Sequence, residues 1–191
     1  MTSLQALSVV FLLSLSVQAE EPPPAEPQAP PPAPEAAEPP AELHELIGLF
    51  GGAWSCAGLL FEPGSEKGRP FTSVLEVGSD LGGFWLAGTE RRQAESAGGS
   101  HVRLFFWSYD PIPGQYAGGW IDSVGGWSSQ TSFGWQQDQL TMFGPVSTSG
   151  VLAKAKEVFT RPVEGRFTRT YDIAVDTDKW VRSSEQTCSR H

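Results

Sequence analysis

Cysteine and histidine are scarce in this chain of 191 residues. It holds two cysteines, Cys56 and Cys188, and three histidines, His44, His101 and His191. A metal site needs several His, Cys or carboxylate ligands that converge on one point, and no spacing of that kind occurs here. We therefore expect neither a metal nor a cofactor.

Positive charge is missing from the first 45 residues. Seven of the 22 acidic residues lie there, together with none of the 13 lysines and arginines. The remaining residues carry 15 acidic against 13 basic side chains, so most of the formal net charge of −9 belongs to the N-terminal segment. Because nucleic-acid binding needs a concentrated basic surface, we exclude that class of partner.

Long hydrophobic runs are also lacking, and the longest one is too short for a comfortable membrane span of about 20 residues. It runs from Leu4 to Leu15, and Val17-Gln18-Ala19 follow with the small residues of a leader-peptidase site. We predict a signal peptide over residues 1–19 and an exported protein, periplasmic or extracellular. An uncleaved leader that tethers the protein to a membrane is the alternative.

Residues 20–42 hold ten of the sixteen prolines, interspersed with glutamates. Prolines favour an extended chain and donate no backbone N–H, while the glutamates repel one another. Such a segment buries no core, and we predict a disordered acidic Pro-rich linker. Pro-rich segments can also bind SH3 or WW domains, but in an exported protein a spacer is the favoured interpretation.

The folded domain is predicted over residues 43–191. Leu43, Leu46, Ile47 and Phe50 form one apolar stripe of a short helix over residues 41–50. Beyond it, β-branched and aromatic runs alternate with turn residues, a pattern typical of an all-β fold. We predict an up-and-down antiparallel barrel of about 8–10 strands, with strands near 53–62, 70–79, 83–92, 101–109, 115–123, 128–135, 139–144, 155–161, 166–175 and 179–189.

The two cysteines lie on the first and last predicted strands. In a closed meander with an even number of strands, the first and last strands are antiparallel neighbours. The residue numbers of any two opposed residues on such a pair add up to the same total. Cys56 with Cys188 and Trp54 with Arg190 both sum to 244. One register therefore predicts a disulfide, which an oxidising compartment would permit, and a Trp54–Arg190 barrel-closure pair. Two unrelated buried thiols are the alternative.

A helix followed by Gly52-Ala53-Trp54, with an Arg facing that Trp from the last strand, resembles the lipocalin and wider calycin signature. The interior segments resemble an uncharacterised, mostly bacterial lipocalin-like family, known only as a domain of unknown function. The resemblance covers residues 44–191 and implies a barrel but no established chemistry. It rests on "LGGFWLAG", "WSYDPIPGQYAGGWIDSVG", "LTMFGPV", "KEVFTR" and "SEQTCSR". Nitrobindins, barrels of related shape, bind haem through a late-strand histidine; none lies there in this chain, so we expect no haem.

A hairpin over residues 101–123 carries the best candidate for a ligand site. Setting Tyr109 opposite Tyr116 places aromatics of the hairpin and the pair Arg103/Asp122 on one face, which we expect to look inward. The candidates that would line the lumen are Trp85, Arg103, Phe105, Trp107, Tyr109, Tyr116, Trp120, Asp122 and Trp135. The alternatives are a barrel filled by its own side chains and an Arg103–Asp122 pair that is purely structural.

Three classes of function follow from this pattern. The first is binding of a small, largely apolar ligand in an aromatic-lined lumen. The second is a structural or protein-interaction module of the cell envelope, acting through the outward apolar residues Leu104, Phe106 and Ile121. The third, an enzyme using Arg103 and Asp122 as an acid–base pair, has the least support. No Gly-x-Ser-x-Gly elbow occurs, and we assign no catalytic residue. The sequence leaves the oligomeric state open.

Overall fold

The structure is a computed structural model that describes residues 37–62, 64–94, 100–175 and 179–191. The predicted leader and residues 20–36 of the predicted linker lie outside this part of the chain. Within it, none of the helices is both long and apolar enough to cross a membrane.

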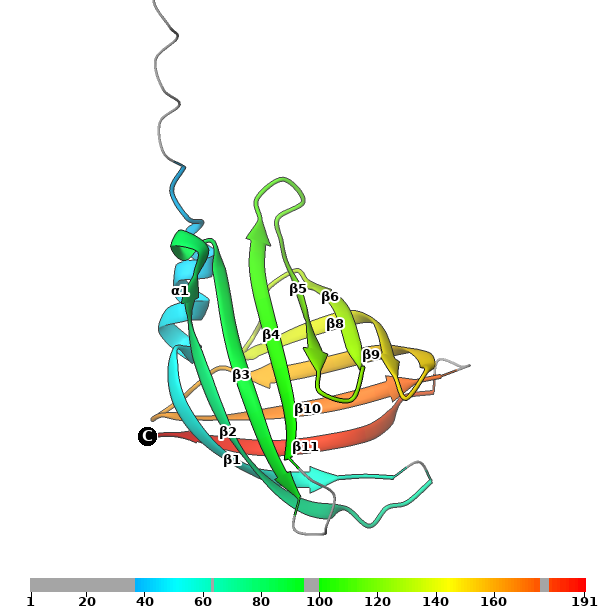
Figure 1. The fold of residues 1–191 in the computed structure, drawn as a ribbon. Coiled ribbons are helices and arrows are strands. Elements are labelled where there is room, and N and C mark those ends of the chain that lie inside the picture. Colours follow the sequence, from blue (N-terminus) through cyan, green and yellow to red (C-terminus); the bar gives the residue numbers. More distant parts are fainter. Residues whose placement is uncertain (1–36, 63, 95–99, 176–178) are drawn as a thin grey trace, which may run out of the picture. The chain divides into compact units, whose positions relative to one another are not determined.

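In the described ranges, one helix and one short 3-10 turn accompany the strands (Figure 1). The helix α1 spans Ala41–Phe50, as predicted, and the turn η1 spans Leu81–Gly83. The strands are β1 (Gly52–Leu60), β2 (Arg69–Asp80), β3 (Trp85–Ala94), β4 (Ser100–Asp110), β5 (Gln115–Asp122), β6 (Trp127–Ser132), β7 (Trp135–Gln136), β8 (Gln139–Thr148), β9 (Val151–Thr160), β10 (Arg166–Ala174) and β11 (Val181–Arg190).

Ten of these strands form a closed antiparallel barrel. Each long strand pairs with the next along the chain, β6 pairs with β8, and β11 returns to pair with β1. The two-residue β7 is an addition to the edge of β8 and lies between β6 and β8 in the sequence. Closure satisfies the backbone groups that an open sheet would leave at its edges. The predicted all-β up-and-down barrel is confirmed.

The helix covers one end of the barrel, which we call the helix end. It lies against β2, β3 and β4, and its stripe residues Leu43, Leu46 and Phe50 are buried. The Phe50 ring contacts four other rings at centroid distances of 5.2 to 6.3 Å, those of Trp107, Trp135, Phe159 and Phe167. Burial of each large apolar side chain is worth about 1.5–3 kcal/mol, so this plug anchors the helix.

The seam between β1 and β11 has the predicted register. Cys56 lies opposite Cys188 and the two form a disulfide. Trp54 lies opposite Arg190, with the guanidinium carbon 4.6 Å from the centre of the indole ring. Both side chains also hold the end of α1: the indole N–H donates to the Phe50 carbonyl at 2.7 Å, and Arg190 donates to the Leu49 carbonyl at 2.7 Å. The seam and the helix plug therefore stabilise one another.

Replacing both cysteines by alanine should lower the free energy of unfolding. The disulfide joins residues 132 positions apart, and releasing so long a loop costs about 2–5 kcal/mol. Equilibrium unfolding in urea measures the change. The control is Ala57→Ser with Thr187→Ala, an exposed pair that lies opposite in the same register. An unchanged midpoint in the cysteine variant would show that the seam holds without the covalent link.

Candidate ligand-binding site

The helix end of the lumen is packed with apolar side chains. Phe50, Leu75, Leu86, Trp107 and Phe159 meet there around a cavity of only about 20 Å³. That volume holds about one water molecule, so the aromatic half of the lumen leaves no room for an organic ligand. Trp107 lies opposite Gly118, where an added Cβ would come within 2.6 Å of the indole.

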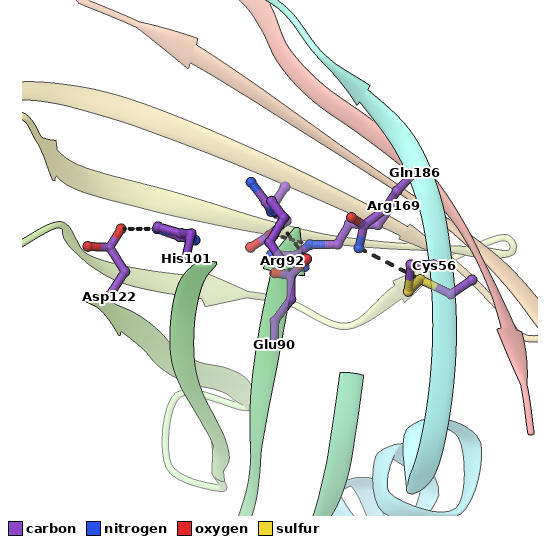
Figure 2. Close-up of polar contacts among 9 residues, drawn as sticks. Cys56, Glu90, Arg92, His101, Asp122, Arg169 and Gln186 are labelled. Carbon is purple, nitrogen blue, oxygen red and sulfur yellow. Dashed lines mark hydrogen bonds and ion pairs between the residues drawn. A yellow bond between two sulfur atoms is a disulfide. The ribbon is translucent and has the colours of Figure 1, made fainter. Parts of the chain in front are cut away.

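A cluster of buried charges forms the next layer. Arg169 of β10 donates from Nε to Glu157 of β9 at 2.5 Å and from Nη1 to Glu90 of β3 at 2.9 Å. Arg92, two residues along β3, donates to the other oxygen of Glu90 at 3.2 Å. Figure 2 shows this cluster in the middle of the view, with the His101–Asp122 pair on one side and the disulfide on the other. Two carboxylates and two guanidinium groups thus neutralise one another within the barrel.

The cluster also fixes the ionisation of its members. Burial alone would raise the pKa of Glu90, but the charges of Arg169, Arg92 and Arg103 outweigh it and hold this pKa well below its usual range. The carboxylates in turn raise the pKa of Arg169, against the effect of burial. Glu90 and Arg169 therefore stay charged at neutral pH.

The far end of the lumen, away from α1, is hollow. A pocket of about 300 Å³ lies there, where β1 and β10 end and where β4 and β11 begin. Its walls combine apolar, hydroxyl and charged side chains: Leu60, Arg92, His101, Arg103, Trp120, Asp122, Val124, Thr148, Tyr171, Ile173, Ser183 and Ser184. The wall of this open space therefore mixes apolar with polar side chains.

Arg103 and Asp122 lie opposite each other on β4 and β5, but they do not form an ion pair. The Arg103 guanidinium stacks on Trp120 instead, 4.0 Å from the ring centre. Asp122 accepts from the Gly126 amide at 2.7 Å and the Val124 amide at 3.1 Å, and it binds the His101 ring at 3.1 Å. Partial burial would raise the pKa of Asp122, but these hydrogen bonds outweigh it and lower the pKa.

The structure divides the nine predicted lining residues into four groups. Arg103, Trp120 and Asp122 line the large pocket, while Phe105 and Trp107, with Trp120, border the small cavity. Tyr109, Tyr116 and Trp135 pack at the helix end: the two Tyr rings meet at 5.1 Å, and Trp135 stacks on Phe50. Trp85 contacts Phe106 on the outer wall, so it lies outside the lumen.

Several pocket and cluster residues were missed by the sequence reasoning, namely Glu90, Arg92, His101, Glu157, Arg169 and Tyr171. Strand alternation carries the signal that could have found some of them, because successive side chains point to opposite faces. On β3, an even number of positions separates Leu86, Glu90 and Arg92, so their side chains face the same side. The same holds on β10 for Phe167, Arg169 and Tyr171. A charged residue whose side chain faces the same side of the strand as the buried residues indicates a polar lumen.

No protein-family model matches the chain, and no curated protein matches it. Among solved structures, the chain is similar to the crystal structure of Rv2717c from M. tuberculosis, with a TM-score of 0.62 and 11% sequence identity. The match covers 81% of this chain and 99% of that one. At this identity the likeness shows the fold alone.

Replacing Glu90 by glutamine should destabilise the barrel at neutral pH. Removing one partner of a buried ion pair typically costs about 3–5 kcal/mol, because the remaining charges stay buried without compensation. The folded pKa of Glu90 is depressed, so its contribution is present above the unfolded value of 4.5 and disappears as the pH falls through the folded value. The variant should therefore lose less stability on acidification than the wild type.

Urea unfolding at several pH values between neutral and acid measures both effects. Glu76→Gln is the control, because Glu76 is exposed on the neighbouring strand β2. Equal stability of Glu90→Gln and Glu76→Gln at neutral pH would contradict this account of the cluster.

Proposed function

We propose that this protein is an exported binding protein of lipocalin-like type, which holds a small molecule in the far end of its lumen. The observation that carries the proposal is the pocket of about 300 Å³ there. That volume lies at the lower end of the range of small-molecule sites, and its mixture of apolar walls with a few polar groups is typical of them.

The ligand predicted from the sequence is small and largely apolar, and the pocket refines that expectation. Leu60, Val124 and Ile173 supply apolar wall, and the face of Trp120 is shared with Arg103. Because polar side chains line the rest, the best fit is a molecule with an apolar body and a polar end. The disulfide and the leader-like N terminus support export to an oxidising compartment.

Binding of an uncharged aromatic probe, N-phenyl-1-naphthylamine, tests the proposal. Its fluorescence should rise on titration with the protein and saturate at one probe per chain. Ile173→Trp should weaken binding by about tenfold or more, because the larger side chain fills the pocket. Leu152→Trp is the control, since Leu152 is 65% exposed. No saturable binding, or equal binding by both variants, would refute a lumen site.

A second candidate function, interaction through the outer wall, is favoured by one observation. Leu104, Ile121 and Trp127 lie side by side across β4, β5 and β6, and they are 41 to 50% exposed. The buried stripe of α1 packs at the helix end, so the chain's own helix leaves this row uncovered.

Association of chains through this row would make the sedimentation coefficient rise with protein concentration. Leu104→Ser with Ile121→Ser should abolish the rise, because it removes apolar area at the centre of the row. The control is Thr141→Ser on β8, which is also exposed. A wild-type protein that sediments as a monomer at all concentrations would exclude self-association by this face.

A further inference from the structure

Arg103 is a buried cation that makes no direct ion pair with any of the described residues. The residue is 7% exposed, and no carboxylate of the described residues lies within ion-pair distance of its guanidinium. Its register partner Asp122 is held by His101 and by two backbone amides. Buried arginines are normally paired, so this one requires another explanation.

In the neighbouring charge cluster, both carboxylates have arginine partners other than Arg103. Glu90 and Glu157 are matched by Arg92 and Arg169, which make the direct hydrogen bonds. Arg103 adds a third guanidinium beside this neutral set. Burial and repulsion by Arg169 lower the pKa of Arg103 to about 10, although attraction by Glu90 and Glu157 opposes them. The group still carries its charge at neutral pH.

Three enclosed polar atoms lie on Arg103 itself and on the two rings beside it. The guanidinium lies 4.0 Å from the Trp120 ring centre and 5.7 Å from that of Tyr171. Arg103 Nε, Trp120 Nε1 and Tyr171 Oη are all enclosed and have no hydrogen-bond partner within the part of the chain that the structure describes. Burial raises the pKa of Tyr171, so its hydroxyl keeps its proton. All three residues line the pocket at the far end.

We propose that this pocket binds an organic carboxylate, with the carboxylate paired to Arg103 and the hydrocarbon part against Leu60, Val124 and Ile173. The inference rests on the proposed function and names the chemistry of its ligand. A planar guanidinium stacked on an indole is pre-organised to donate two parallel N–H bonds to a planar carboxylate.

One negative charge suits this site better than two. Among the described residues of this cluster, Arg103 is the one guanidinium without a hydrogen-bonded carboxylate, and Asp122, which binds the His101 ring, also lines the pocket. A second negative charge on the ligand would face Asp122 and the nearby Glu90 and Glu157 without a cation to match it. A monocarboxylate should therefore bind more tightly than a phosphate monoester of equal chain length.

Isothermal titration calorimetry at pH 7.5 with decanoate, decan-1-ol and decyl phosphate tests the inference. Decanoate should bind the wild type at least about tenfold more tightly than the alcohol. A charge-assisted hydrogen bond to a buried guanidinium strengthens binding by that factor. Decyl phosphate should fall between the two. Equal affinity for acid and alcohol would overturn the carboxylate assignment while the lumen site stands; binding of none of them would overturn both.

Variants locate the interaction on Arg103. Arg103→Met should remove the preference for decanoate over decanol, and Arg103→Lys should retain part of that preference. Arg91→Met is the matched control, an exposed arginine on β3. Near-ultraviolet circular dichroism checks the fold of each variant. If Arg103→Met does not fold, the affinities of the wild type for decanoate and for decan-1-ol decide whether the carboxylate assignment holds. An undiminished preference in a folded Arg103→Met would overturn the proposal.

Discussion

Closure between β1 and β11 is the constraint on which the rest of this protein depends. A meander becomes a barrel with a lumen only if its two ends pair, and here a disulfide and the Trp54–Arg190 stack fix that pairing. Trp54 and Arg190 also donate hydrogen bonds to the carbonyls at the end of α1. The closed seam therefore also positions the plug that fills one end of the lumen.

Within the closed barrel, strand alternation sorts the lumen into layers. Aromatic side chains fill the helix end, a balanced cluster around Arg169 spans the middle, and the far end is hollow. Burial makes each charge of the cluster costly alone, so the cluster is held together by mutual neutralisation. The same rule gives Arg103 its significance, because none of the described carboxylates forms an ion pair with it. In our proposal, the carboxylate of a ligand is the partner of Arg103.

The sequence predicted the barrel, the seam register and the hairpin pairing of Arg103 with Asp122 correctly, because hydrophobic periodicity and the constant sum of opposed residue numbers are local or geometric signals. It did not predict where the lumen is open. Trp107 and Trp120 look equivalent in the sequence, but only Trp120 reaches the large pocket. The difference depends on α1, whose Phe50 fills the space around Trp107, and on charges from three further strands. Such long-range packing leaves no local pattern.

The ionisation of a bound acid tests the central claim most directly. Decanoate labelled with ¹³C at its carboxyl carbon reports its own protonation by chemical shift when bound to the full-length protein. If Arg103 holds the carboxylate, the bound acid should titrate at a lower pH than the free acid, because an adjacent cation stabilises the charged form. A bound carboxyl that titrates at a higher pH than the free acid would mean burial without a paired cation, and it would contradict the account.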